Sequence, residues 1–522
     1  MHRVQFNYSM KNIGIPSRNQ YLRNLIEKTE DVVHRMRWKA YFYLHGENRV
    51  EENNNYGLRS NKCAPPIKEM RDFEEDLVNL ISNISFRNVS DPFLTKVEED
   101  LKRVNSSKDI FVFADKTTNI YETSPDNYKK LLRENITKSY KISSSKVTED
   151  INSELRDISN HLSIGNRIDI MSKPNAFVTV KDHKENFPAN LKCRLINPAK
   201  SNLGKVSKVI LDRINSNIRT ILNVNQWKNS YSVIEWFKNI HDKQKHIFLS
   251  FDIVEFYPSI TEELLNRVIE WAKSLTPLSD DEIAIIKHAR KSLLFHDDLT
   301  WVKRNNESMF DVTMGSFDGA EICELVGLYI LDKLAKKLGY KNVGLYRDDG
   351  LVLIKSTNGR HADITRKMLH NIFEQIGLKI TAKVNNQLVD FLDVTLDLSN
   401  GKFTPFRKPN NKPQYVNSRS NHPPCIIKQI PKSINQRLSS LSSDKQSFNS
   451  CKPFYEHALK ESDYDVSLHF SDCKTTTTLP CVKRKRQRNI IWYNPPFSKS
   501  VKSNVARNFL QLLDKHFPAG NP

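Results

Sequence analysis

The sequence lacks several features that define common protein classes. It has no run of 18 apolar residues, which disfavours a protein that spans a membrane through helices. Its start has no apolar stretch of the kind found in secretory signal peptides, which disfavours classical secretion. The motifs GxxxxGK[ST], HExxH and GxSxG are absent. Their absence disfavours the commonest rival classes of enzyme, which are the P-loop, zinc-protease and serine-hydrolase types.

Cysteine is scarce and scattered. The chain has seven cysteines in 522 residues, an odd number, and none forms a CxxC pair. This usage indicates the reduced thiols of an intracellular protein rather than a disulfide framework. One zinc set can be assembled, but its spacing matches none of the common zinc sites. Its members are Cys451, His457, Cys473 and Cys481.

Positive charge is in excess. The chain has 80 Lys and Arg against 60 Asp and Glu, a net charge of +20, which favours a polyanionic partner with nucleic acid as the first candidate. Residues 171–210 hold eight Lys and Arg against two acids, and 401–440 and 481–510 each hold eight against none. These stretches suit a groove that grips a nucleic-acid backbone. A merely soluble basic protein is the alternative.

The texture of the sequence changes along the chain. The first hundred residues carry apolar positions three to four apart, which predicts helices. From about residue 110, short β-branched and aromatic runs alternate with longer amphipathic segments, as in a mixed α/β or α+β core. Beyond residue 400, polar loops separate predicted helices. The length suggests roughly three or four structural units.

Three aspartates interrupt apolar runs. HIFLSFDIVEF predicts a buried strand that ends with the carboxylate of Asp252, and VGLYRDDGLVLI predicts a hairpin with Asp348 and Asp349 at its tip. Adjacent carboxylates repel one another unless a cation compensates them, and oxygen ligands suit Mg²⁺. Two such ions about 4 Å apart can activate a hydroxyl and stabilise a leaving pyrophosphate. A polar turn on a surface hairpin is the alternative.

The order of the motifs resembles the palm of reverse transcriptases. FDIVEFYPSI resembles motif A, MGSFDGAE takes the place of motif B before a predicted helix, and YRDDG resembles motif C. IFEQIGLKITAK resembles motif D, and LVDFLDVTLDL with FTPFRKPNN resembles motif E and the primer grip. The segment FVTVKDHKENFPANLKCRLINPAKSNLGKVSK resembles the fingers hairpin. Three flanking segments resemble those of Penelope-like retroelement reverse transcriptases: DIFVFADKTTNIYETSPDNYKKLL, YVNSRSNHPPCIIKQIPKSINQRL and NIIWYNPPFSKSVKSNVARNFLQLLDKHFP. The whole resemblance runs from about residue 106 to residue 518.

This resemblance implies an α+β right-hand polymerase with an antiparallel palm sheet backed by helices. Its regions would be a helical N-terminal extension (1–105), a fingers-like region (106–245), a palm (246–400) and a basic, thumb-like region (401–522). The implied activity is RNA-directed DNA polymerisation, in which a DNA primer is extended on an RNA template with dNTPs. Many Penelope-like proteins continue into a GIY-YIG endonuclease, whose motif is absent from this chain.

The resemblance also implies roles for single residues. The ligands of two Mg²⁺ ions, with Mn²⁺ as the alternative metal, would be Asp252, Asp348, Asp349 and the backbone carbonyl of Ile253. The nucleotide-binding residues would be Lys181, Lys184, Arg194, Tyr257 and Gly315. Tyr257 takes the place of the bulky side chain that excludes ribonucleotides. In motif D, Lys383 would donate a proton to pyrophosphate, and Lys379 competes for that role.

Two departures from the family pattern concern activity. Motif B reads Thr313-Met314-Gly315 instead of a Pro-Gln-Gly-like turn, and Gly319-Ala320 instead of Ser-Pro. Arg347 stands within YRDD where a small or apolar residue is commoner, and its guanidinium would compete with metal unless it points away. A nucleic-acid-binding protein without turnover and a template-independent terminal transferase are therefore alternative functions.

The basic run KRKRQR at 483–488 predicts nuclear import, with a nucleic-acid contact or a linker as alternatives. We accordingly expect an intracellular, nuclear protein. No motif specifies a protein partner.

Overall fold

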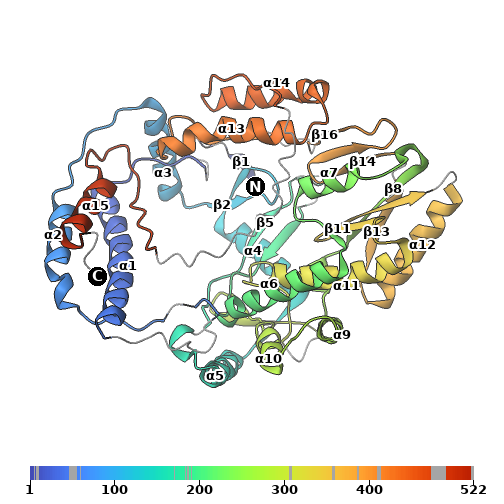
Figure 1. The fold of residues 1–522 in the computed structure, drawn as a ribbon, viewed down its shortest axis with the longest axis horizontal. Helices are drawn as coiled ribbons and strands as arrows, with labels where there is room; N and C mark the ends of the chain where they lie inside the picture. Colours follow the sequence, from blue (N-terminus) through green and yellow to red (C-terminus); the bar gives the residue numbers. More distant parts are fainter. Residues whose placement is uncertain are drawn as a thin grey trace.

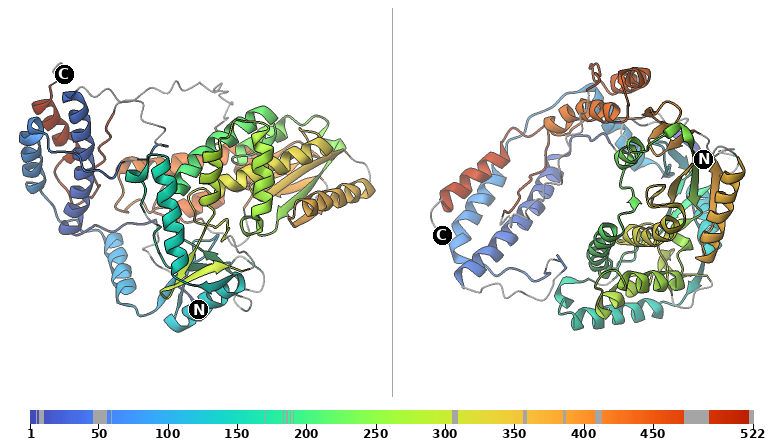
Figure 2. Two further views of the ribbon diagram at one scale, coloured as in Figure 1. Left: turned by 90° about the horizontal axis from the view of Figure 1, so that it is seen from below. Right: turned by 45° about the vertical axis from the view of Figure 1, so that its right-hand side comes forward.

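The computed structural model describes residues 1–518 with the exception of 5, 7–10, 46–55, 59, 170, 183, 185–186, 188, 190, 305–308, 356–358, 385–386, 408–412 and 472–489. Helices and sheets alternate along the described residues, so the predicted mixture of the two is confirmed. The ribbon follows a ring, with a helical bundle on one side and the largest sheet on the other (Figures 1 and 2). In the described part of the chain, no helix is both long and apolar enough to cross a membrane.

The helical bundle joins the two ends of the sequence. It consists of α1 (Arg18–Leu44), α2 (Arg71–Ser82) and α15 (Val505–His516), and α3 (Pro92–Ser106) leads away from it. Phe73 of α2 and Phe509 of α15 pack in one apolar cluster with Val32 of α1. Asp76 of α2 accepts hydrogen bonds from Lys515 and His516. The C-terminal helix therefore belongs with the N-terminal helices in space.

Three small sheets are built from strands that lie between His2 and Lys303 in the sequence. The first has the order β1-β3-β2, the second β4-β10-β9 and the third β5-β6. Their strands are β1 (His2–Val4), β2 (Ile110–Phe113), β3 (Ile120–Thr123), β4 (Tyr140–Ser143), β5 (Phe177–Val180), β6 (Cys193–Ile196), β9 (Leu294–His296) and β10 (Leu299–Lys303). Helices α4 (Pro125–Ser139) and α5 (Lys146–His161) flank them.

The largest sheet has five strands in the order β13-β8-β12-β11-β7. They are β7 (Asn225–Gln226), β8 (His246–Ile253), β11 (Val343–Tyr346), β12 (Asp349–Lys355) and β13 (Ile380–Val384). All neighbours pair antiparallel except β7 and β11, which are parallel. Apolar residues face both sides of the two central strands, so both faces of the sheet can be covered.

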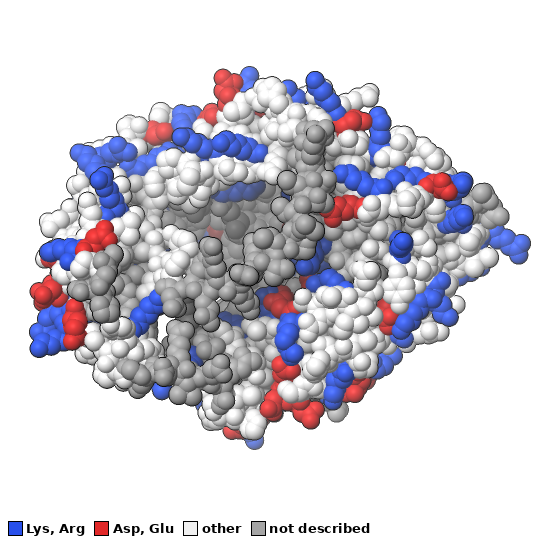
Figure 3. All heavy atoms as spheres, viewed as in Figure 1, with Lys and Arg blue, Asp and Glu red and all other residues white. Residues whose placement is uncertain are grey.

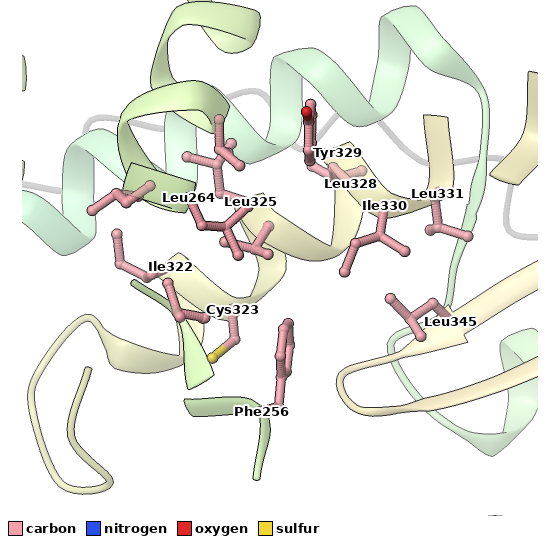
Figure 4. Close-up of a cluster of buried hydrophobic side chains, with 14 of the residues drawn as sticks. Phe256, Leu264, Ile322, Cys323, Leu325, Leu328, Tyr329, Ile330, Leu331 and Leu345 are labelled. Atoms are coloured by element: carbon pink, nitrogen blue, oxygen red, sulfur yellow. The ribbon is translucent and has the colours of Figure 1, made fainter. Parts of the chain in front are cut away.

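One face of this sheet is covered by helices. They are α6 (Leu203–Leu222), α9 (Glu262–Lys273), α10 (Asp280–His288), α11 (Gly319–Leu338) and α12 (Gly359–Gln375). Along β8, Leu249, Phe251 and Ile253 alternate onto this face. Helix α11 is buried on nearly all sides. Its side chains fill the core beside Phe256, from the short helix α8 (Phe256–Ser259), as Figure 4 shows.

The other face carries a second core. Phe248 of β8 and Leu351 and Leu353 of β12 pack there against apolar residues of α7 (Ser230–Lys238). The small sheet β14-β15-β16 joins this core, and α13 and α14 follow it. Their bounds are β14 (Leu388–Phe391), β15 (Val394–Asp397), β16 (Phe403–Pro405), α13 (Pro424–Ser440) and α14 (Lys445–Glu461). The division into fingers, palm and thumb at the predicted boundaries stays a prediction.

Gly344 lies where this second core leaves no room for a side chain. A Cβ at this position would collide with the indole ring of Trp227. We expect Gly344→Ala to lower the free energy of unfolding by about 1–3 kcal/mol, because overpacking a filled core forces side chains and backbone apart. Urea unfolding followed by tryptophan fluorescence measures the change. Gly359→Ala is the matched control, since its Cβ would meet nothing within 4 Å, and an equal loss in both variants would contradict the explanation.

Candidate active site

The three predicted aspartates lie at one corner of the largest sheet. Asp252 is directly opposite Asp349 in the antiparallel pairing of β8 and β12, and Thr381 of β13 flanks Asp252 on the other side. Asp348 occupies the turn before β12, and its carbonyl accepts a hydrogen bond of 3.0 Å from the N–H of Ile253. The sheet therefore brings together residues that are almost one hundred positions apart in the sequence.

The electrostatic state of this corner suits a cation. Burial, and next the negative charge of Asp348, raise the pKa of the Asp252 carboxyl above its usual range, while the charges of Lys116 and Lys184 act in the opposite direction. Both burial and a neighbouring negative charge disfavour the ionised carboxylate, and a bound cation would offset both effects. The described residues contain no group of three or more His, Cys, Asp or Glu arranged to hold a metal. The donor chemistry fits Mg²⁺, which binds through one or two carboxylates and leaves positions for substrate phosphates and water.

A cavity of about 610 Å³ opens on the face that carries these aspartates. Asp252, Asp349 and Lys383 all line it. Lys383 pairs with Ser250, two positions before Asp252 on β8, so the period of two places both side chains on the same face. Lys379, the competing proton donor, instead contributes its backbone carbonyl, which accepts from the N–H of Val254 over 2.9 Å.

Tyr257 lies beside the aspartates and against the start of α11. A Cβ at Gly319 would sit 3.5 Å from Cε1 of Tyr257, and the phenol shares a hydrogen bond with the thiol of Cys323. Burial, followed by the influence of Cys323, raises the pKa of Tyr257 to about 12, and the charge of Asp348 adds to the same shift. The phenol is therefore neutral at physiological pH and is held in place by α11.

Gly315 has a structural reason of its own. Its φ is +123°, in the region that favours glycine, and a Cβ there would sit 2.5 Å from the carbonyl oxygen of Asn197. The loop before α11 can therefore approach the end of β6 only with glycine at this position. A nucleotide contact at Gly315 stays a prediction.

The predicted nucleotide-binding cations belong to the hairpin β5–β6: Lys181 and Lys184 follow β5, and Arg194 lies in β6. Arg194 forms an ion pair of 2.8 Å with Asp115. Burial, and then the charge of Arg194, lower the pKa of Lys181. Lys184 is exposed, and its charge acts on Asp252. Of the predicted nucleotide-binding cations in the hairpin, Lys184 is therefore the one whose charge acts on Asp252.

Two residues of this region were not assigned by the sequence. Lys116 directly follows Asp115, the ion-pair partner of Arg194. Its positive charge acts to lower the pKa of Asp252. Asp182, in the turn after β5, accepts hydrogen bonds from Thr117 Oγ1 (2.7 Å), Asn119 Nδ2 (2.6 Å) and Tyr121 Oη (3.0 Å). Only the spacing of acidic and basic residues in ADKTTN and KDHK hinted at these positions.

Three further features of the sequence are Arg347, the basic C-terminal stretches and the candidate zinc set. Arg347 has a left-handed φ of 54° and an exposed side chain, and its guanidinium carbon lies 5.7 Å from the centre of the Tyr346 ring. Lys and Arg side chains gather along α13 (Figure 3), where the sequence has no acid. Cys473 and Cys481 of the zinc set and the basic run 483–488 lie outside the described residues.

Comparisons with known proteins find likeness in structure alone. No family model matches the sequence, and no curated protein matches it. A telomerase from Candida albicans in complex with a TWJ fragment of telomeric RNA is 11% identical, with a TM-score of 0.47 over 85% of this chain and 84% of that one. Apo telomerase from Candida tropicalis is 11% identical, with a TM-score of 0.39 over 84% of each chain. The RNA-dependent RNA polymerase of a human picobirnavirus is 12% identical, with a TM-score of 0.37 over 80% of this chain and 93% of that one. Because these TM-scores are below 0.5, we derive the function from the site.

Asp182 should hold the basic turn after β5 in place. We expect Asp182→Ala to cost about 1–3 kcal/mol of stability, because three donors lose their acceptor, and to speed amide exchange in the β5–β6 hairpin. Hydrogen–deuterium exchange with peptide resolution measures this local effect. Asp109→Ala, at an exposed position before β2, is the control. Equal exchange of the hairpin in both variants would contradict the role of Asp182.

Proposed function

We propose that the protein is a reverse transcriptase, which extends a DNA 3′-hydroxyl on an RNA template with deoxynucleoside triphosphates. The observation that carries the proposal is the pairing of Asp252 with Asp349 across two central strands, with Asp348 at the adjoining turn. The charges of Lys184 in the β5–β6 hairpin and of Lys116 before β3 act on this corner. One acidic centre for cations and one basic hairpin for a triphosphate are the parts that nucleotidyl transfer requires. The order of the motifs supports the RNA-directed reaction, and the flanking segments support a Penelope-like retroelement as the source. The basic run 483–488 supports the nucleus as the place of action.

The aspartates and the basic hairpin divide the work of the reaction. Asp252, Asp348 and Asp349 would hold Mg²⁺, and a bound ion there would supply the positive charge that a transferring phosphoryl group and an attacking hydroxyl require. Lys181 and Lys184 bind the triphosphate through charge-assisted hydrogen bonds and orient its α-phosphate. Catalysis consists mainly of positioning and electrostatic stabilisation, and no covalent bond to the protein forms.

Two further side chains have assigned roles, Tyr257 in the choice of nucleotide and Lys383 in proton transfer. Tyr257 takes the sequence position of the bulky side chain that excludes ribonucleotides in reverse transcriptases, so we assign its neutral ring the role of favouring deoxynucleotides. Lys383 lines the same cavity as Asp252 and Asp349 and donates a proton to the leaving pyrophosphate, which needs a general acid near the metal centre.

Primer extension tests the proposal directly. Purified protein is given a heteropolymeric RNA template annealed to a DNA primer, Mg²⁺ and all four dNTPs. We expect products that reach the end of the template. We expect Asp252→Asn and Asp348→Asn each to reduce the rate by at least about a thousandfold, because each removes a charge that the transition state requires.

The matched control is Asp397→Asn. Asp397 is an aspartate of β15 whose oxygens bind Ser399 and Asn400, so this variant should keep the wild-type rate. Extension that ignores the template sequence would support terminal transfer instead. Salt-sensitive binding of the duplex without any extension would support a binding protein that lacks turnover, and would overturn the proposal.

A further inference from the structure

A fully buried ion pair lies behind the proposed active site. Arg290 follows α10, and Asp318 immediately precedes α11. Both side chains are 0% exposed, and the guanidinium Nη2 contacts Oδ1 of the carboxylate. Among the described residues, Nε and Nη1 of Arg290 and Oδ2 of Asp318 find no hydrogen-bond partner. Such a pair is expensive to bury and contributes little net stability, so its presence requires another explanation.

The carboxylate of Asp318 contacts Arg290 and does not cap the helix that follows it. Asp318 is the N-cap residue of α11, but its side chain makes no capping hydrogen bond. Aspartate at an N-cap normally accepts a hydrogen bond from a backbone N–H of the first turn. Here the ion pair instead fixes the loop between Thr313 and Gly319 to the end of α10. The carbonyl of Arg290 also accepts a hydrogen bond of 2.9 Å from the N–H of Asp311.

The first turn of α11 connects this pair to Tyr257. Gly319 follows Asp318, and it lies so near the phenol ring that a Cβ at this position would sit 3.5 Å from Cε1 of Tyr257. Cys323 lies four residues further on, so it is on the same side of the helix, and it shares a hydrogen bond with the phenol. The charge of Arg290 also acts on the Cys323 thiol, which shows that the guanidinium is near. Any shift of the helix start therefore moves the surface against which Tyr257 rests.

We infer that the Arg290–Asp318 ion pair positions the start of α11 and through it sets how strictly Tyr257 discriminates deoxyribonucleotides from ribonucleotides. The inference rests on the proposed function. Arg290 and Asp318 are positioning residues, because they act on the substrate only through Gly319, Cys323 and the phenol. A directed ion pair suits this task better than apolar packing, since it has one preferred geometry.

The test is the ratio of kcat/KM for a dNTP to that for the matching rNTP in primer extension. We expect Asp318→Asn to lower this ratio about tenfold, because a small displacement of a positioned group changes rates strongly. Arg290→Lys keeps the charge and should retain most of the selectivity. Tyr257→Val is the positive control and should lower the ratio further. Asp332→Asn is the negative control and should leave the ratio unchanged. It alters another buried carboxylate of α11, which accepts hydrogen bonds from Trp271 of α9 and from Lys336 of α11.

A double variant separates positioning from simple folding. Arg290→Met combined with Asp318→Leu removes both charges and leaves no unpaired group, so the protein should fold. We expect it to unfold at a urea concentration close to that of the wild type and still to lose selectivity about tenfold, since the directed contact is gone. A folded double variant with the wild-type ratio would overturn the inference.

A readout that needs no catalysis separates this inference from the proposed function. Cys323 is 1% exposed, whereas Cys63 and Cys425 are exposed. Alkylation by iodoacetamide, followed peptide by peptide in a mass spectrometer, should be slow at Cys323 in the wild type and faster in Asp318→Asn relative to Cys425. Wild-type protein that fails to extend any primer overturns the proposed function. Unchanged protection of Cys323 overturns the positioning role, whatever the activity.

Discussion

The pairing register of β8 with β12 is the constraint on which the candidate site depends. Side chains alternate between the two faces of a strand, so a slip by one residue would turn every side chain of β12 to the opposite face. In the observed register, Phe251 and Val352 face the helices, while Asp252 and Asp349 share the other face with Leu351. Apolar burial on both faces opposes a slip. The free energy that folds the sheet therefore also aligns the two carboxylates.

This alignment has a cost that the rest of the sheet offsets. Like charges directly opposite one another destabilise an antiparallel pair. The pKa of Asp252 is raised by its partial burial and, next, by the charge of Asp348 at the adjoining turn. The cost is local, because the neighbouring positions of β8 and β12 are deeply buried on both faces. Cations reach the corner from another part of the chain, through Lys116 and Lys184. A bound metal and a triphosphate would compensate the same charges more fully.

The sequence could reveal features that depend on neighbours in the chain. The strand that ends at Asp252 and the hairpin with Asp348 and Asp349 follow from apolar alternation interrupted by acids, and both occur where the pattern predicted them. The packing of α15 on α2 joins segments more than 400 residues apart. No local pattern announces such a contact. The region predicted from composition, 401–522, therefore includes both α13 and α15, although α15 packs against the N-terminal helix α2.

Buried polar contacts were the other feature beyond the reach of the sequence. Arg290 lies in an ordinary-looking segment after a helix, and nothing in its neighbours distinguishes a buried guanidinium from a solvated one. Asp115 is equally unremarkable until Arg194 is seen beside it. Such partners are chosen by tertiary structure. The sequence indicates only that basic and acidic residues are available.

The unusual motif B can be understood from these contacts. The residues that replace the Pro-Gln-Gly-like turn retain Gly315, whose backbone approaches Asn197 too closely for any side chain. The start of α11 is then held by Asp318 through its buried contact with Arg290. Close approach and an ion pair together fix the path of the backbone without help from a glutamine. The loop therefore carries Met314 where the pattern it resembles has a glutamine, but it stays anchored at both ends, beside Tyr257 and the aspartates.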